Sequence, residues 1–326
     1  MADLTTTYMG LHLKNPIIIA SCGFTDSVAE IQKLEEQGAA AVVLKSLFEE
    51  QILMDVDEQR VNNIYGTYAD VESYVSFYTK KRRLDDYLKL IRESKAQTSI
   101  PIIASINCVS DAQWVEFAGK IQEAGADALE LNMFIMPSDE TFTGGQIEQI
   151  YFDVVKRVKA QTSLPVALKI SYFFSGMANF AIRLSDTGIS ALVLFNRFFN
   201  PDIDLETGQI VSSHLYSSPE ENSMVLRWTG ILSGKVHCDL AATTGIHNGQ
   251  SAIKNLLMGA RAVQISSVIY KKGIPVVGQI LREMEEWMDR KGYASLREVI
   301  GLMSQQNLSR PMMVERAQFM KYFADV

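Results

Sequence analysis

The chain has 326 residues, with 31 lysines and arginines against 38 aspartates and glutamates, which gives a formal net charge of -7. Hydrophobic residues make up 47% and charged residues 21% of the chain, so it can bury a large core and does not belong to the disordered class. The acidic balance, with no stripe of basic residues to offset it, argues against a nucleic-acid partner. No apolar run reaches the roughly 18–20 residues that a membrane span requires, so no membrane association is expected.

The first ten residues are polar and lack the apolar segment of a secretory signal peptide. Three cysteines, Cys22, Cys108 and Cys238, lie far apart and form neither a pair nor a cluster with metal-site spacing. A sparse and odd number of cysteines is typical of a reducing compartment. We therefore expect a cytoplasmic protein that uses no metal.

Eight short apolar runs recur along the chain, separated by longer amphipathic stretches. In chain order the runs cover residues 16–20, 40–45, 101–106, 126–132, 165–170, 191–196, 236–242 and 260–266. Runs of this length without strict alternation are typical of parallel strands that are buried on both faces. Helical periodicity lies between them, for example over residues 112–124, 146–160, 249–258 and 276–289.

The junctions between these segments support the alternation of strands and helices. Four predicted helices end in a glycine directly before the next strand, at Gly38, Gly125, Gly188 and Gly259. Glycine ends a helix at low cost because it adopts the left-handed conformation readily. Eight strand–helix units with right-handed crossovers close naturally into a (β/α)8 TIM barrel, which we expect to form one domain over residues 1–326. A doubly wound open sheet is the alternative that the alternation alone leaves open.

Two connections are long enough to be insertions in the barrel. They cover residues 46–83 after the second predicted strand and residues 197–235 after the sixth. Connections of this length usually form lids or carry structure of their own. The second contains the capping-box sequence Ser218-Pro219-Glu220-Glu221, which predicts the start of a helix running toward Leu232. Because both insertions follow carboxyl ends of strands, we expect them over the mouth of the barrel.

Polar residues cluster at the predicted carboxyl ends of the strands, where a TIM barrel holds its active site. In chain order they are Ser21, Lys45, Ser46, Asn107, Asn132, Lys169, Asn196, Thr243, Thr244, Gly245, Ser266 and Ser267. The residues after strands seven and eight predict a phosphate site, because these loops and a helix starting near 248–250 offer free backbone N–H groups. Ordinary turn residues are the other interpretation of this sequence.

Lys45 and Lys169 stand inside otherwise apolar runs. Burying an ammonium group is costly unless it is paired, so two such lysines indicate function. Each side chain extending past its strand into solvent is the alternative. Lysine supplies positive charge, and the amides of the strand-end asparagines both donate and accept hydrogen bonds. Together these groups suit a planar heterocycle with a phosphate tail.

With these residues placed, the chain resembles the dihydroorotate dehydrogenase family, and in particular its soluble class 1 members. The resemblance runs nearly from end to end of the chain. It rests on Lys14-Asn15-Pro16, Ala20-Ser21, Lys45-Ser46, Leu131-Asn132, Leu168-Lys169, Asn196, Thr244-Gly245-Ile246, Gly249-Gln250 and residues 257–265.

The resemblance implies a single FMN-binding barrel domain that oxidises dihydroorotate to orotate in pyrimidine synthesis. FMN would be held by Ala20, Ser21, Lys45, Ser46, Asn107, Asn132, Lys169, Thr244, Gly245, Ser266 and Ser267. The pyrimidine would face Lys45, Asn63, Asn132 and Asn196. The charge of Lys169 would offset the negative charge that reduction places on the flavin. Class 1 members are commonly dimers, so the resemblance also implies a homodimer.

The chain departs from the family pattern in the half of the site that would hold substrate. Ile135 stands where class 1 members carry a catalytic cysteine, and an isoleucine accepts no proton. A positioned base is worth about 10²–10⁴-fold in rate. Ser138 is the expected replacement, with Thr141 and Thr143 as further candidates. Arg197 replaces a serine, and Ala242 and Thr244 stand at positions that are usually glycine.

These departures leave several functional hypotheses open. The catalytic residues expected for dihydroorotate oxidation are Lys45, Lys169 and Ser138. A flavin enzyme for another reduced pyrimidine or an unsaturated acid is the first alternative, and a catalytically impaired flavin-binding relative is the second. A Schiff-base aldolase using Lys169 is the third. The electron acceptor would be fumarate, a quinone, or a partner subunit carrying FAD and an iron–sulfur cluster.

Overall fold

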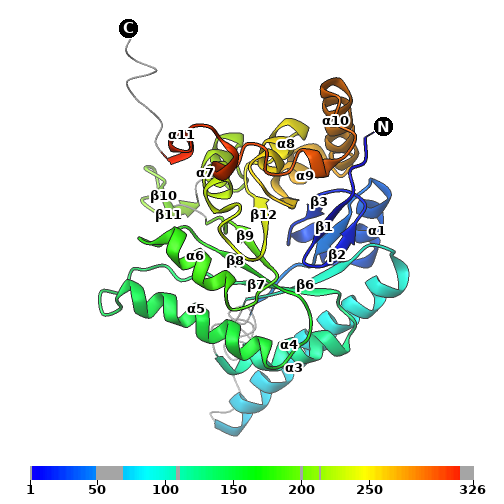
Figure 1. Ribbon diagram of the computed structural model, residues 1–326. Helices are drawn as coiled ribbons and strands as arrows, with labels where there is room; N and C mark the ends of the chain where they lie inside the picture. Colours follow the sequence, from blue (N-terminus) through cyan, green and yellow to red (C-terminus); the bar gives the residue numbers. More distant parts are fainter. Residues whose placement is uncertain (1, 49–68, 108–110, 199–200, 213, 316–326) are drawn as a thin grey trace.

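The computed structural model describes residues 2–48, 69–107, 111–198, 201–212 and 214–315. Within these residues, eight parallel strands close into a barrel, because the last strand pairs with the first and the second pairs with the third (Figure 1). The barrel strands are β3 (Ile17–Ile19), β4 (Ala41–Val43), β6 (Ile102–Asn107), β7 (Ala128–Asn132), β8 (Val166–Ile170), β9 (Ala191–Leu194), β12 (Asp239–Thr243) and β13 (Ala262–Ile265). The predicted TIM barrel is confirmed, and the open sheet is excluded.

Helices surround the ring of strands on its outer side (Figure 1). They are α1 (Val28–Glu36), α3 (Ala69–Gln97), α4 (Asp111–Glu123), α5 (Gly144–Lys159), α6 (Met177–Ser185), α7 (Asn222–Leu232), α8 (Gly249–Leu257), α9 (Ser267–Lys272) and α10 (Val276–Lys291). The four glycines predicted to end helices all have left-handed backbones, with φ between 78° and 111°. The helix–glycine–strand junctions are therefore confirmed.

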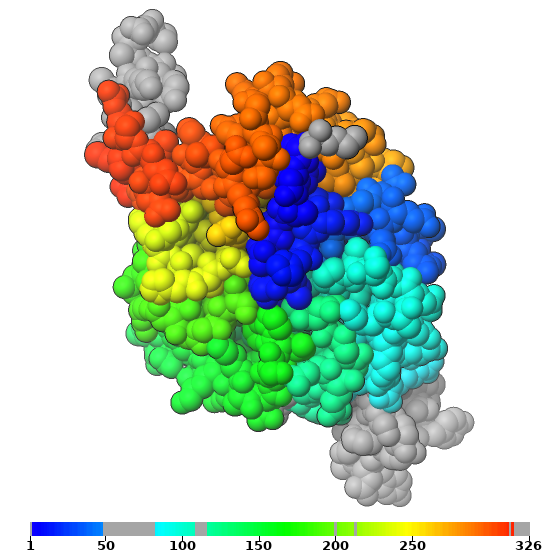
Figure 2. All heavy atoms as spheres, turned by 45° about the vertical axis from the view of Figure 1, so that its right-hand side comes forward, coloured from blue at the N-terminus to red at the C-terminus, as the bar shows by residue number. Residues whose placement is uncertain are grey.

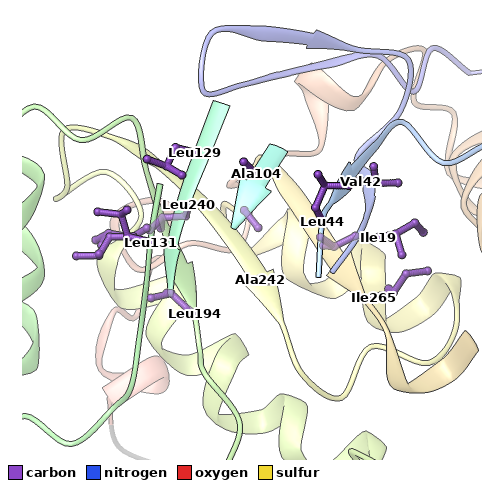
Figure 3. Packing of buried hydrophobic residues seen from close by; sticks show 14 of the residues in the cluster. Ile19, Val42, Leu44, Ala104, Leu129, Leu131, Leu194, Leu240, Ala242 and Ile265 are labelled. Carbon is purple, nitrogen blue, oxygen red and sulfur yellow. The ribbon is translucent and has the colours of Figure 1, made fainter. Parts of the chain in front are cut away.

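The hydrophobic core has two layers, one on each side of the strands. The outer layer lies between strands and helices and includes Leu44, Leu131 and Ile265 (Figure 3). The inner layer fills the barrel with small side chains such as Ala128, Ala167 and Ala241. Successive residues of a strand point to opposite faces, so each strand contributes to both layers.

An N-terminal hairpin closes the amino end of the barrel. Its strands are β1 (Thr6–Tyr8) and β2 (Leu11–Leu13), which pair antiparallel. Tyr8, Met9 and Leu13 are buried in the inner layer. Asp3, which precedes the hairpin, hydrogen-bonds with the backbone of Ala294 and Leu296, and Figure 2 shows the blue N-terminal segment lying against the orange part of the chain.

The insertions lie after the predicted strands. After β4, the short strand β5 (Leu47–Phe48) pairs with β6, and residues 69–83 are the first part of α3. After β9, the hairpin of β10 (Pro201–Ile203) and β11 (Ile210–Ser212) precedes a 3-10 turn, Pro219–Glu221, and then α7. The Ser218 N–H donates to Glu221 Oε1 at 2.7 Å, so the predicted capping box is confirmed.

The remaining described elements are short: the 3-10 turns Gly23–Thr25, Leu296–Glu298 and Gln305–Asn307, and α11 (Met312–Glu315), which lies beside α7 (Figure 1). Among the residues described, no helix is both long and apolar enough to pass through a lipid bilayer.

Two buried tyrosines differ in what their hydroxyl groups bind. Tyr8 is fully buried and its hydroxyl has no hydrogen-bond partner among the described residues, whereas the Tyr87 hydroxyl donates to Ser105 O at 3.0 Å and accepts from Ser105 N at 2.7 Å. We expect Tyr8→Phe to raise the free energy of unfolding by about 1 kcal/mol, because it removes a buried unpaired polar group. Tyr87→Phe should lower it by a similar amount. Chemical denaturation of both variants measures this, and equal effects of the same sign would contradict it.

Candidate active site

A cavity of about 360 Å³ lies at the carboxyl ends of the barrel strands. Its wall is made by residues at or just after the ends of β3, β4, β7, β8, β9, β12 and β13. Cavities of this size and position are where TIM barrels bind small molecules.

Most of the residues predicted for the site line this cavity. They are Ala20, Ser21, Lys45, Ser46, Asn132, Lys169, Asn196, Thr243, Thr244, Gly245, Ser266 and Ser267. Asn107 ends β6 but does not line the cavity, and Ser138 lies exposed on the loop after β7, outside its wall. Asn63 lies outside the described residues.

Strand alternation explains why these residues come together. Ala128 of β7 belongs to the inner layer, so Glu130 and Asn132 share its inward face at period two. In β13 the same period leads from Ala262 to Gln264 and then to Ser266. Reading the strands at period two would have identified Glu130 and Gln264, which the sequence analysis missed.

Lys169 belongs to a buried polar cluster with Glu130 and Gln264. The Lys169 ammonium lies 3.8 Å from Glu130 Oε1 and 3.5 Å from Gln264 Oε1. Gln264 Nε2 donates to Glu130 Oε2 at 2.6 Å. Only 13% of the lysine side chain is exposed, so the prediction of a buried, paired lysine holds at this position.

Lys45 is placed differently from the sequence expectation. Strand β4 ends at Val43, so Lys45 follows the strand instead of standing inside it. Half of its side chain is exposed, and its ammonium lies 3.6 Å from Asp26 Oδ2. The alternative of a lysine that extends past its strand into solvent is therefore correct for Lys45, which still lines the cavity.

A chain of hydroxyl groups supports the wall near Lys45. Ser21 Oγ accepts from the Ser46 N–H at 2.9 Å and lies 3.1 Å from Ser46 Oγ. Ser46 Oγ lies in turn 2.7 Å from Ser105 Oγ, which is fully buried. These bonds fix the orientation of Ser21 and Ser46 where they meet the cavity.

Two consecutive residues in the loop after β12 have left-handed backbones. Thr244 has φ 77° and Gly245 has φ 75°. The glycine common at the Thr244 position takes this conformation freely, whereas threonine does so at a cost of roughly 1–2 kcal/mol. The Thr244 hydroxyl donates to Phe195 O at 3.3 Å, and Asn222 Nδ2 donates to Thr244 O at 3.0 Å. These two bonds compensate for the missing glycine.

The expected contribution of the α8 amino terminus to an anion site is not seen. The Gly249 N–H donates to Glu283 Oε2 at 2.6 Å, and the Ser251 N–H donates to the Asn248 side chain at 2.8 Å. These amides are therefore committed to protein acceptors. Anion binding in this part of the cavity would depend on the residues at 243–245 and 266–267 themselves.

Positive charge and a neutral histidine lie behind these loops. Lys271 Nζ donates to Ser217 O at 2.8 Å, and Lys272 Nζ lies 3.5 Å from His247 O. The buried His247 ring contacts Ser217 Oγ at 3.2 Å. Burial, followed by the charge of Lys271, lowers the pKa of His247 below its usual value.

Arg197 fastens the segment 214–221 to the end of β9. Its guanidinium donates to Glu221 Oε2 at 2.8 Å, to Leu215 O at 3.1 Å and to His214 O at 2.6 Å. Leu215 lines the cavity. Arg197 therefore shapes the wall, with its donors directed to protein acceptors.

Ile135, at the position where the resemblance implies a catalytic cysteine, does not line the cavity. Ile135 is half-buried against the outer core layer. Cys22 lines the cavity, but burial raises the pKa of its thiol, so it stays protonated at neutral pH. Neither Ile135 nor Ser138 lines the cavity, so the replacement of the base by Ser138 stays a prediction.

The left-handed loop generates a stability prediction. A Cβ at Gly245 would collide with the backbone and side chain of Asn222, and the positive φ adds strain. We expect Gly245→Ala to lower the free energy of unfolding by about 2–3 kcal/mol. Gly208→Ala is the matched control, because Gly208 also has a positive φ but nothing lies within 4 Å of its added Cβ. Equal losses in the two variants would show that the contact with Asn222 is unimportant.

His247 generates a prediction about pH. Because its pKa is lower in the folded than in the unfolded state, the unfolded chain binds the extra proton first as the pH falls. The free energy of unfolding should therefore decrease as the pH drops through about 6.5, the unfolded value. His247→Gln should remove this part of the decrease. Denaturation curves between pH 8 and pH 5.5 measure it, and an identical pH slope in both proteins would refute it.

Comparison with known proteins gives the family of the chain. The model of the family described as dihydroorotate dehydrogenase matches residues 3–288. The catalytic subunit of dihydroorotate dehydrogenase B (NAD(+)) from Thermoplasma volcanium is 25% identical over 314 residues, covering 93% of this chain and 99% of the relative. Its counterpart from Thermoplasma acidophilum is 27% identical over 311 residues, with the same coverage. A putative dihydroorotate dehydrogenase A (fumarate) from Aeropyrum pernix is 25% identical over 307 residues, covering 92% and 97%. The chain belongs to the dihydroorotate dehydrogenase family.

Proposed function

We propose that this protein binds FMN in the cavity at the barrel mouth and oxidises dihydroorotate to orotate. The observation that carries the proposal is one cavity that joins a buried ammonium group, on Lys169, to the hydroxyl-rich loops around Gly245 and Ser266. Family membership supports the reaction, because the relatives are named as dihydroorotate dehydrogenases. A Schiff-base aldolase has no such support.

The residues present suit the chemical groups of FMN. The loop at 243–245 approaches Asn222 so closely that only glycine fits at position 245, and the hydroxyl-bearing residues Thr243, Ser266 and Ser267 line the cavity beside it. Such groups suit a phosphate, and Lys271 and Lys272 add positive charge behind them. At the other end, Lys169 and Asn132 offer a charge and an amide to a polar heterocycle.

The residues of the chain would then act as follows. Bound FMN would supply the two-electron acceptor for the substrate hydride. Lys169 would stabilise the negative charge that develops on the ring. The amide nitrogen of Asn196 donates to Met133 O at 2.9 Å and to Lys169 O at 3.2 Å, which fixes its orientation for holding a substrate. Lys45, at the open side of the cavity, would attract an anionic substrate.

A second candidate is a flavin enzyme for another reduced pyrimidine or an unsaturated acid, and the residues after β7 favour it. Ile135 offers no proton acceptor, and its neighbour Phe134 packs on Phe198 and Phe173. Arg197, which stands where the resemblance implies a serine, lines the cavity and has its guanidinium bonded to Glu221. A catalytically impaired relative would share these features.

The names of the relatives also bear on electron transfer. Several are called catalytic subunits of an NAD(+)-dependent enzyme, which implies a partner subunit in those proteins. We extend this to the present chain as part of the proposal, together with a homodimeric catalytic core.

The absorbance spectrum of the purified protein tests the proposal. After incubation with FMN and removal of free FMN by gel filtration, we expect the protein to retain a flavin spectrum. Anaerobic addition of dihydroorotate should then bleach this spectrum. Protein that stays colourless would reject FMN binding. A flavin spectrum that bleaches with dithionite but not with dihydroorotate would favour the second candidate.

Ile135 generates a prediction about rate. Dihydroorotate should bleach the flavin slowly in the natural protein, and Ile135→Cys should accelerate bleaching by about 10²-fold, because it places a thiol where the resemblance implies the proton acceptor. Stopped-flow absorbance measures both rates. Met136→Cys, at the exposed neighbouring position, is the control and should have no effect. Equal rates for Ile135→Cys and the natural protein would mean that proton removal does not limit this reaction.

A further inference from the structure

Glu130 is a carboxylate buried inside the barrel, at 1% exposure. Its Oε2 accepts a hydrogen bond from Gln264, but its Oε1 receives none from the described residues and lies 3.8 Å from the Lys169 ammonium. Glu130 does not line the cavity. It therefore touches neither solvent nor the space where a ligand would bind.

The cost of this arrangement indicates a role beyond packing. Burying a carboxylate is unfavourable even when it is paired, and an apolar side chain of similar size often packs as well or better. The inner layer of the barrel is apolar and includes Ala128, Ala167 and Val193. A charged residue with one unbonded oxygen needs an explanation in such a place.

The strand register shows where Glu130 lies relative to the cavity. Asn132 of β7 pairs with Lys169 of β8, and Glu130 pairs with Ala167, two residues earlier on both strands. Glu130 therefore lies one layer deeper in the barrel than Lys169, on the side away from the mouth. The Lys169 ammonium lies between this carboxylate and the cavity that it lines.

Glu130 and Gln264 both contact the Lys169 ammonium and also bond to each other. Gln264 bridges the two charges, because its amide nitrogen donates to Glu130 while its amide oxygen lies within 3.5 Å of the ammonium. A charge in a site of low polarity acts strongly on its neighbours, and a counter-charge on its far side weakens that action. The carboxylate thus both restrains Lys169 and partly neutralises it.

We propose that Glu130 is a positioning residue that holds Lys169 and sets how strongly its charge favours reduced over oxidised FMN. The inference rests on the proposed function, since it takes FMN as the ligand. It adds to that function a determinant of flavin potential that lies beneath the site instead of in its wall.

The test is the midpoint potential of bound FMN in four proteins: the natural chain, Glu130→Gln, Lys169→Met and the double variant. Glu130→Gln removes the counter-charge and keeps the shape of the side chain. The equilibrium ratio of reduced to oxidised FMN should therefore rise about tenfold. For a two-electron couple this is a potential about 30 mV higher. Lys169→Met should lower the potential. In the Lys169→Met background, Glu130→Gln should shift the ratio by less than threefold, because the carboxylate acts through the lysine.

Several outcomes would overturn the inference without touching the proposed function. One is a potential unchanged by Glu130→Gln in protein that binds FMN normally. Another is an equal shift with and without Lys169, which would mean that Glu130 acts directly. Glu148→Gln is the matched control, because it removes a carboxylate paired with Arg183 on the outer helices, and it should leave the potential unchanged. Failure of the natural chain to bind FMN would instead reject the proposed function.

A second variant keeps the inference testable if Glu130→Gln does not fold, as judged by circular dichroism. Gln264→Met retains both charges but removes the amide, whose nitrogen bonds Glu130 Oε2 and whose oxygen faces the Lys169 ammonium. The carboxylate would then interact with Lys169 alone and neutralise it more fully. The equilibrium ratio of reduced to oxidised FMN should therefore fall about threefold. An unchanged midpoint potential would overturn the inference.

Discussion

The site depends on one geometric constraint, the alternation of side chains between the two faces of each barrel strand. Inward positions near the amino end carry small apolar residues that fill the barrel, as Ala128 and Ala167 do. Two residues further along the same strands, the inward positions carry Glu130 and Lys169. The change from apolar to polar side chains along one face thus marks the boundary between core and cavity, and a shift of register by one residue would turn these groups into the outer layer.

The fold could be predicted from sequence because its signals are local and repeated. The apolar runs gave the strands, and the glycine before each of four strands gave the helix ends, which have left-handed backbones. The capping box at Ser218 predicted where the second insertion becomes helical. These features are fixed by a few neighbouring residues, so no knowledge of the tertiary structure was required.

The site could be predicted only in part, because its details depend on contacts between distant residues. Most of its wall follows from the strand ends, but the pairing of Lys169 with Glu130 requires the register of β7 against β8. Lys45 was expected inside its strand, yet the strand ends two residues earlier and the side chain is half exposed. The α8 amino terminus was expected to be available for an anion. In the structure, the Gly249 N–H donates instead to Glu283, which lies 34 positions further along the chain.

The two halves of the cavity differ in how closely they follow the family pattern. On the side of Gly245, threonine replaces glycine without loss of the loop conformation, because two hydrogen bonds compensate. On the side of β7, Ile135 stands where the resemblance implies a catalytic cysteine, and it packs against the outer core layer.

The N-terminal hairpin, at the opposite end of the barrel, depends on segments that are distant in sequence. Two of the first ten residues bond to partners 230 or more positions away, Thr6 to Arg261 O and Met9 to the Asp239 side chain. Because these partners lie at β12 and just before β13, the hairpin completes its contacts with the barrel only once these distant segments are in place.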